Sequence, residues 1–334
     1  MRAKDNTMQQ SMTIAVFGAT GAQGGSVARA LLARRDPTIR VRALTRQPGA
    51  PRAQALAALG AEVQHADLDE PSSLIGAIQG ADAVFGVTNF WEHFSPDREL
   101  AQARHLAEAV RRTRLRHLVW STLEDTRRWV PLEDPRWPTL MQHYKVPHMD
   151  AKGASDEFML AAGVPLTLLR TSFYWDNLIH FGMAPQPGPD GTLQFLLPMG
   201  DRPLPGTAAE DIGRCAAALL LRGPKGAVQT VGVAGEHLSG AQMAAQMAQL
   251  LQRPVRHVDP GHAGYAALGF PGAADLANMF AFKHDFNDEY CARRNVQATR
   301  RLHPGLLDFR SWLALHAAEL SACIAPQETA QEVA

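Results

Sequence analysis

The sequence predicts an α/β fold: a doubly wound parallel sheet, followed by a smaller and mostly helical second lobe. From residue 12 to residue 173, short apolar runs alternate with segments whose apolar residues have helical spacing. A glycine-rich turn joins the first of these runs to the first helical segment. This alternation is typical of parallel strands that are covered by helices on both faces.

The alternating part of the chain contains six expected strands and five expected helices. Pro71 opens one helix and Gly80 ends it, and Gly60 ends another, because Pro suits the first helical turn and Gly the position after the last. Pro147 starts the fifth helix, since a Pro forces the preceding residue into extended geometry. The expected strands are 12–18, 41–46, 61–67, 81–89, 116–122 and 165–173, and the other helices are 26–35, 50–60, 71–80 and about 97–112.

The pattern loosens after residue 173, where short apolar runs mix with helical segments. We expect a sheet domain over residues 12–173 and a smaller C-terminal lobe over 174–322, with some of the later chain returning to the sheet. The segment LLQRPVRHVD is a further candidate strand. The polar ends, 1–11 and 323–334, are expected to be loose tails.

Composition excludes several classes of protein. Apolar residues make up 46% of the 334 residues, which is enough for a normal core, and 33 basic residues balance 33 acidic ones. A balanced charge gives no electrostatic footprint for nucleic acid, and no apolar run is long enough to span a membrane. The three widely spaced cysteines fit a reducing compartment, so we expect a cytoplasmic protein, and no histidine pair has the spacing of a metal site.

The glycine-rich turn, GATGAQG, places Gly18, Gly21 and Gly24 between the first strand and the first helix. Gly18 permits the tight turn, Gly21 lets backbone approach a pyrophosphate, and Gly24 lets the helix pack against the strand. The N-terminus of the helix then offers N–H groups and a positive dipole to the phosphates. In a strand–turn–helix context, this spacing predicts a Rossmann-type dinucleotide site.

The end of the second strand indicates which dinucleotide binds. An NAD site usually places an acidic residue there for the ribose hydroxyls, whereas an NADP site places a cation there for the 2′-phosphate. This sequence has Arg46 and no acid, and the planar guanidinium can donate two hydrogen bonds to a phosphate. NADP(H) is therefore the expected cofactor, with a solvated surface arginine as the alternative interpretation.

Polar residues also end the third and fourth strands. Asp67 could meet the adenine amino group or serve as a loop residue, and sequence alone does not separate the two. Thr88 and Asn89 lie at the carboxyl edge of the sheet, where ligands bind in open α/β folds. The aromatic residues Phe90 and Trp91 follow, as candidates for a nicotinamide pocket or for ordinary packing.

The expected helix from Pro147 raises the question of catalysis. Reductases with such a helix usually carry Tyr-x-x-x-Lys, but here His148 precedes Lys152 by one turn, and Tyr144 falls before the helix. Lys152 is a candidate ribose or nicotinamide contact. His148 could be a general acid or merely an exposed histidine at the helix start. Ser121, at the end of the fifth strand, is a further candidate catalytic residue.

Taken together, these motifs resemble the NmrA-like family, an atypical branch of the short-chain dehydrogenase/reductase superfamily, and within it the HSCARG branch. The matching segments are VFGATGAQGGSVARALL, VRALTRQP, VTNFWEHF, HMDAKGASDEF, SFYWDNL and LGFPGAADLANMF. The contacts with NADP(H) that the resemblance and the motifs imply involve Gly18, Ala19, Thr20, Gly21, Ala22, Gln23, Gly24, Arg46, Asp67, Leu68, Thr88, Asn89, Phe90, Lys152, Tyr174, Trp175, Asp176 and Asn177.

The resemblance implies a regulator that senses the NADPH/NADP ratio and lacks the usual Tyr-x-x-x-Lys catalysis. Its partner would be another protein or a second copy of the chain. The alternative is an NADPH-dependent reductase of a small carbonyl or enone held between the lobes. Related isoflavone-reductase-like proteins lack the Tyr and use a lysine as the base, so in that case Lys152 could serve in the same way, or His148 would manage the proton.

Overall fold

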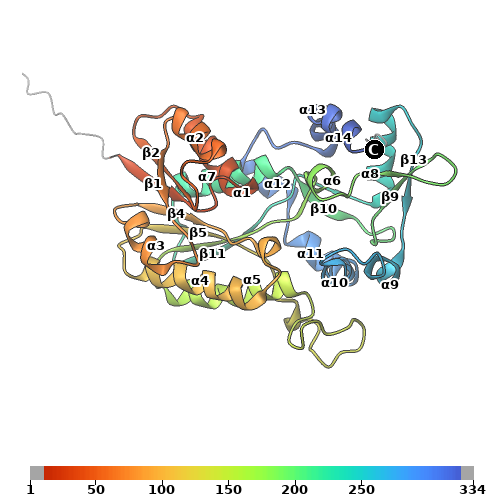
Figure 1. The fold of residues 1–334 in the computed structure, drawn as a ribbon, viewed down its shortest axis with the longest axis horizontal. Coiled ribbons are helices and arrows are strands. Elements are labelled where there is room, and N and C mark those ends of the chain that lie inside the picture. The colour runs from red at the N-terminus through yellow and green to blue at the C-terminus, as the bar shows by residue number, and fades with distance from the viewer. Residues whose placement is uncertain (1–10, 325–334) are drawn as a thin grey trace, which may run out of the picture. The chain divides into compact units, whose positions relative to one another are not determined.

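A computed structural model describes residues 11–324, and its main feature is a seven-stranded sheet (Figure 1). The strand order is β11-β6-β5-β4-β1-β2-β3, and every pair is parallel. The predicted parallel sheet is therefore confirmed. The strands are β1 (Met12–Val16), β2 (Ile39–Thr45), β3 (Glu62–His65), β4 (Ala83–Gly86), β5 (His117–Thr122), β6 (Leu166–Arg170) and β11 (Val228–Gly232).

Helices cover both faces of this sheet, as the doubly wound prediction requires. In Figure 1, α1 and α7 lie on one face, and α3, α4 and α5 lie on the other. The order reverses between β1 and β4, which makes the carboxyl ends of these strands the place where open α/β folds bind ligands. The helices are α1 (Ala22–Leu32), α2 (Pro51–Ala58), α3 (Pro71–Ile78), α4 (Pro96–Arg111), α5 (Pro147–Ala161), α7 (Ala209–Arg222) and α12 (Val296–Leu302).

The core on the α3–α5 side is built from the inward stripes of these helices. Leu106 and Val110 of α4 and Met159 of α5 are fully buried and meet Leu118 and Trp120 of β5. Burial of this apolar surface is the main term that stabilises the layered arrangement.

Close contact between α1 and α7 depends on a glycine. A Cβ on Gly213 would overlap with the backbone and side chain of Ser26. The two helices therefore approach at backbone distance on the other face of the sheet.

Contacts group the chain into two compact units that are not continuous in sequence. The first unit holds the sheet and includes residues 209–233 and 297–304, which bring α7, β11 and most of α12 to it. Among the described residues, the second unit comprises 172–208, 234–296 and 305–324. Residues 323 and 324 belong to its last helix, so the expected loose tail was wrong for these two positions, whereas 1–10 and 325–334 lie outside the described residues.

The second unit combines helices with two three-stranded sheets. Its sheets have the orders β12-β10-β7 and β13-β9-β8. The candidate strand in LLQRPVRHVD is β13. The elements are β7 (Phe173–Tyr174), α6 (Asn177–His180), β8 (Gln186–Pro187), β9 (Leu193–Leu196), β10 (Leu204–Thr207), β12 (Glu236–Leu238), α8 (Gly240–Leu251), β13 (Val255–Val258), α9 (Gly261–Ala266), α10 (Ala273–Asp285), α11 (Asn287–Ala292), α13 (Phe309–Leu315) and α14 (Ala317–Ile324).

Candidate functional site

The glycine turn lies between β1 and α1 with the geometry that a dinucleotide needs. Gly18 has a φ of +61°, a conformation that favours glycine. A Cβ on Gly24 would overlap with the backbone oxygens of Phe17 and Gly18, so this glycine lets the helix start directly against the strand. Gly21 and Ala22 are exposed, and no side chain caps the N-terminus of α1. An exposed glycine backbone at an uncapped helix start is suited to bind a pyrophosphate.

Ser121 connects this turn to the fifth strand. Its hydroxyl donates to Oε1 of Gln23 at 2.8 Å, and the serine is 2% exposed. The fold therefore places Ser121 beside the glycine turn. A catalytic role for it stays a prediction.

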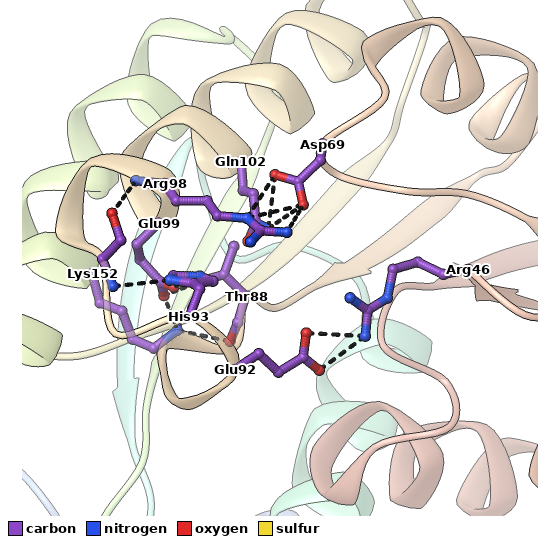
Figure 2. Close-up of polar contacts among 10 residues, drawn as sticks. Arg46, Asp69, Thr88, Glu92, His93, Arg98, Glu99, Gln102 and Lys152 are labelled. Carbon is purple, nitrogen blue, oxygen red and sulfur yellow. Dashed lines mark hydrogen bonds and ion pairs between the residues drawn. The ribbon is translucent and has the colours of Figure 1, made fainter. Parts of the chain in front are cut away.

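Lys152 lies at the centre of a buried polar cluster (Figure 2). Its ammonium nitrogen is 2.9 Å from the carbonyl oxygen of Thr88, 2.8 Å from Oγ1 of Thr88 and 2.6 Å from Oε1 of Glu99. An ammonium has three N–H donors, and each of them has an acceptor here. In this conformation Lys152 holds the end of β4 against α4, and a ribose contact would require it to exchange one of these partners.

Glu99 is the counter-charge of Lys152, and the sequence reasoning missed it. Its side chain is fully buried and also accepts a hydrogen bond from Thr88 Oγ1 at 2.5 Å. Burial by itself would raise the pKa of Glu99, but Lys152, His93 and Thr88 together lower it to about 2. The signal was available, because Glu99 lies on the same helical stripe as the buried residues Ala103, Leu106 and Val110.

His93 lies on the other side of Glu99. Its Nε2 is 3.5 Å from Glu99 Oε2, and its Nδ1 accepts a hydrogen bond from the backbone N–H of Ser95. The segment after β4 thus reaches the Glu99–Lys152 pair from a second direction. In the sequence, only the aromatic residues of this segment stand out as candidates, and His93 does not.

His148 is buried, so its interpretation as an exposed helix-start residue was wrong. It is 5% exposed, and its ring lies 4.8 Å from the ring of Trp91 and 6.1 Å from that of Phe90. The aromatic residues after β4 therefore pack on the first turn of α5. A proton-donor role for His148 stays a prediction.

Tyr144 lies before α5, as the position of Pro147 indicated. It pairs with Leu140 in an isolated β-bridge, and the guanidinium of Arg127 lies 5.3 Å from its ring. Burial is the main cause that raises the pKa of Tyr144 above its usual value.

A buried aspartate fixes the start of α5. Oδ2 of Asp150 accepts the backbone N–H groups of Lys145 and Val146, and Oδ1 accepts both N–H and Oγ1–H of Thr126. Four accepted bonds hold the helix start and the loop after β5 in one position. Burial, as the largest effect, raises the pKa of Asp150.

Arg46 lies just after β2, where it was expected, but it already has a partner. Its Nη2 is 3.0 Å from both carboxylate oxygens of Glu92, and the side chains are 51% and 45% exposed (Figure 2). Arg46 is therefore a half-exposed arginine held in an ion pair, and its contact with a 2′-phosphate stays a prediction.

The loop after β3 is held by hydrogen bonds within itself and to α4. Oδ1 of Asp67 accepts the backbone N–H of Asp69, and the carbonyl oxygen of Leu68 lies 2.7 Å from Nδ1 of His105. Asp69 accepts several bonds from Arg98. Asp67 thus makes the loop contact that the sequence analysis had considered, and an adenine contact stays a prediction.

The remaining predicted contacts are divided between the two units. Thr88 and Phe90 are buried and Asn89 is exposed, all in the first unit. The stretch from Tyr174 to Asn177 belongs to the second unit. There Trp175 is 1% exposed and packs 5.4 Å from the ring of Phe309.

The first unit by itself fits a dinucleotide phosphate. It offers an exposed glycine backbone, an uncapped helix start and a half-exposed arginine at the end of the neighbouring strand.

Within residues 11–324, no three His, Cys, Asp or Glu side chains gather as a metal site would need. None of the helices in the same range combines the length and apolar character needed to cross a membrane.

Comparisons with solved structures find the same fold in proteins that were crystallised with dinucleotides. NmrA, a negative transcriptional regulator, was solved in complex with NADP; it aligns with a TM-score of 0.72 and 22% identity over 94% of this chain and 98% of that one. Its complex with NAD aligns with a TM-score of 0.73. The NADPH-dependent quinone oxidoreductase QOR2 of Escherichia coli, complexed with NADPH, has a TM-score of 0.68 and 21% identity over 91% and 99% of the two chains. At this identity, the likenesses show the fold.

The sequence comparisons extend over most of the chain. The NmrA-like family domain-containing oxidoreductase ptmS of Penicillium ochrochloron is 26% identical over 344 residues, covering 92% of this chain and 98% of that protein. The model of the NmrA-like family matches residues 10–313. The protein therefore belongs to the NmrA-like family.

Proposed function

We propose that the protein binds NADP(H) at the carboxyl edge of its sheet and acts as a redox-sensing regulator of the HSCARG kind. The glycine turn would hold the pyrophosphate and Arg46 the 2′-phosphate. The proposal agrees with NmrA, which is named a transcriptional regulator and was crystallised with NADP. The free cysteines, Cys215, Cys291 and Cys323, favour a reducing compartment such as the cytoplasm.

The observation that carries the proposal is the state of Lys152. All three of its donors are engaged by Thr88 and Glu99, and no tyrosine stands one turn before it. Breaking a buried ion pair by removing one charge is costly, so Lys152 is held as the counter-charge of Glu99. The proposed dinucleotide site would therefore lie beside a lysine that has no tyrosine to form a proton-transferring Tyr–Lys pair.

A reductase is the second candidate, since QOR2 and ptmS are named oxidoreductases. One observation in this chain favours it: His148 lies against Trp91 and Phe90, which follow the strand end where a nicotinamide would be expected. In this case His148, rather than Lys152, would donate the proton to a carbonyl or enone reduced by NADPH.

Two measurements on the same purified protein separate the candidates. The first compares the sedimentation or scattering profile with saturating NADPH and with saturating NADP⁺. A sensor requires a difference between them, because a ligand that binds two states equally shifts neither. The second follows NADPH oxidation with carbonyl, enone and quinone substrates.

The outcomes differ for the two functions. Identical profiles together with turnover that His148→Gln abolishes would replace the regulator by a reductase. Distinct profiles without turnover support the regulator.

A further inference from the structure

The partner of Arg46 comes from the segment that follows a different strand. Glu92 lies in a short 3₁₀ turn, Phe90–Glu92, that follows β4, and it places its carboxylate on the arginine that follows β2 (Figure 2). NAD sites usually carry an acid at the end of the second strand itself. This chain therefore has the cation expected of an NADP site and, from the 3₁₀ turn after β4, a carboxylate at the same place.

The position of Glu92 is set by a fixed backbone. Phe90 is 1% exposed, and its carbonyl oxygen accepts the N–H of Phe94 at 2.8 Å. His93, the residue after Glu92, has its Nε2 3.5 Å from Oε2 of the buried Glu99. Because both sides of Glu92 are anchored, its carboxylate is presented to Arg46 by the fold rather than by a mobile surface loop.

A 2′-phosphate and Glu92 need the same donors. Bidentate binding of a phosphate uses two N–H groups of the guanidinium fork, and Nη2 is already shared between both oxygens of Glu92. A phosphate that reached Arg46 would have to displace this carboxylate or lie beside it, and both alternatives weaken its binding. A cofactor without the 2′-phosphate makes no such demand.

We propose that Glu92 is a specificity-determining residue that competes with the 2′-phosphate of NADP(H) for Arg46. This inference rests on the proposed cofactor site. An exposed ion pair is weak, so NADP(H) still displaces Glu92, but its advantage over NAD(H) is reduced. Removing the charge of Glu92 should therefore tighten binding of NADPH and leave binding of NADH unchanged.

The test is a calorimetric titration of wild-type protein, Glu92→Gln and Glu62→Gln with NADPH and with NADH. Glu62 is the matched control: it is an exposed carboxylate paired with Arg42 of strand β2, so its substitution removes the same charge without touching Arg46. We expect Glu92→Gln to raise the NADPH affinity about two- to fivefold, the range that loss of an exposed ion pair corresponds to. Glu62→Gln should change neither affinity.

The same titrations in an Arg46→Ala background separate competition from simple repulsion. Without the arginine there is nothing to compete for, so the gain from Glu92→Gln should disappear. A gain of equal size without Arg46, or an equal gain in the Glu62→Gln control, contradicts the competition. The competition is also contradicted if the ratio of NADPH to NADH affinity is the same in the wild type and in Glu92→Gln.

Failure of the inference differs from failure of the cofactor site. If the wild-type protein binds neither nucleotide, the proposed function is wrong and the inference falls with it. If the wild-type protein binds both and Glu92→Gln alters neither, the site stands and only the role of Glu92 is refuted.

Discussion

At the scale of single residues, the main feature of the candidate site is the buried ion pair of Lys152 and Glu99. The side chain of Glu99 is fully buried and that of Lys152 is 12% exposed. Thr88 bonds to both members, so the pair closes a network in which each donor of Lys152 has an acceptor. Removing one member of such a pair lowers the stability of the fold far more than replacing both members by apolar residues.

Lys152→Met should therefore destabilise the protein by about 3–5 kcal/mol, because it leaves a buried carboxylate without its counter-charge. The double variant Lys152→Met/Glu99→Leu should recover most of this loss, since apolar residues of similar volume replace such pairs at little cost. Urea unfolding at pH 7 measures both values. A loss in the double variant that equals the sum of the losses in Lys152→Met and Glu99→Leu would mean that the pair is not coupled.

Asp156 lies one turn after Lys152, and its buried carboxyl group should make the stability of the protein depend on pH. Burial raises its pKa to about 7, although Thr122 and Arg170 favour its charged form, and within residues 11–324 its Oδ1 has no hydrogen-bond partner. The folded-state pKa exceeds the usual value. Asp156 therefore contributes fully to the free energy of unfolding below about pH 4, where it is protonated in both the folded and the unfolded state. This contribution is lost as the pH rises through 7, because the buried carboxyl then becomes charged.

Asp156→Asn should accordingly gain stability relative to the wild type between about pH 5 and pH 8, by about 2–4 kcal/mol. Urea unfolding at the two pH values gives the difference. Glu108→Gln, at an exposed position of α4, is the control and should show no such gain. If the stability difference between Asp156→Asn and the wild type does not change with pH, Asp156 does not titrate between pH 5 and pH 8 and the prediction is contradicted.

At the scale of elements, the glycine turn before α1 packs against the end of β1 and is also the proposed pyrophosphate site. A Cβ added at Gly24 would meet backbone atoms at the end of β1 and in the turn, whereas one added at Gly76, in α3, would have nothing within 4 Å. Gly24→Ala should cost about 1–3 kcal/mol through overpacking and weaken NADPH binding. Gly76→Ala should add about 0.4–1 kcal/mol and leave binding unchanged. Thermal unfolding and titration check both, and a tolerated Gly24→Ala would refute the close approach.

The elements themselves were readable from local pattern. Pro147 marked the start of α5, Gly60 follows the end of α2 with a φ of +102°, and the strand–helix alternation predicted the sheet. The contacts of Glu92 and His148 were not readable, because Arg46 and Trp91 lie 46 and 57 residues away in sequence, respectively. Such pairings depend on the order of strands in the sheet and not on local propensity.

At the scale of the whole molecule, the chain crosses between its two compact units several times. Residues 209–233 and 297–304 return to the sheet unit after intervening segments of the second unit. Periodicity identifies a helix such as α7 but not the unit that receives it. The NADP(H) site, as proposed, draws its glycine turn, Arg46 and Lys152 from the first unit alone.

The role proposed for Arg46 is to bind the 2′-phosphate at this site. It is tested most directly by one competition titration of the purified protein with NADPH, NADP⁺, NADH and NAD⁺, repeated with Arg46→Ala. We predict tighter binding of both phosphorylated forms, and loss of that preference in the variant. Equal affinity for all four nucleotides, or a preference that survives Arg46→Ala, would contradict it.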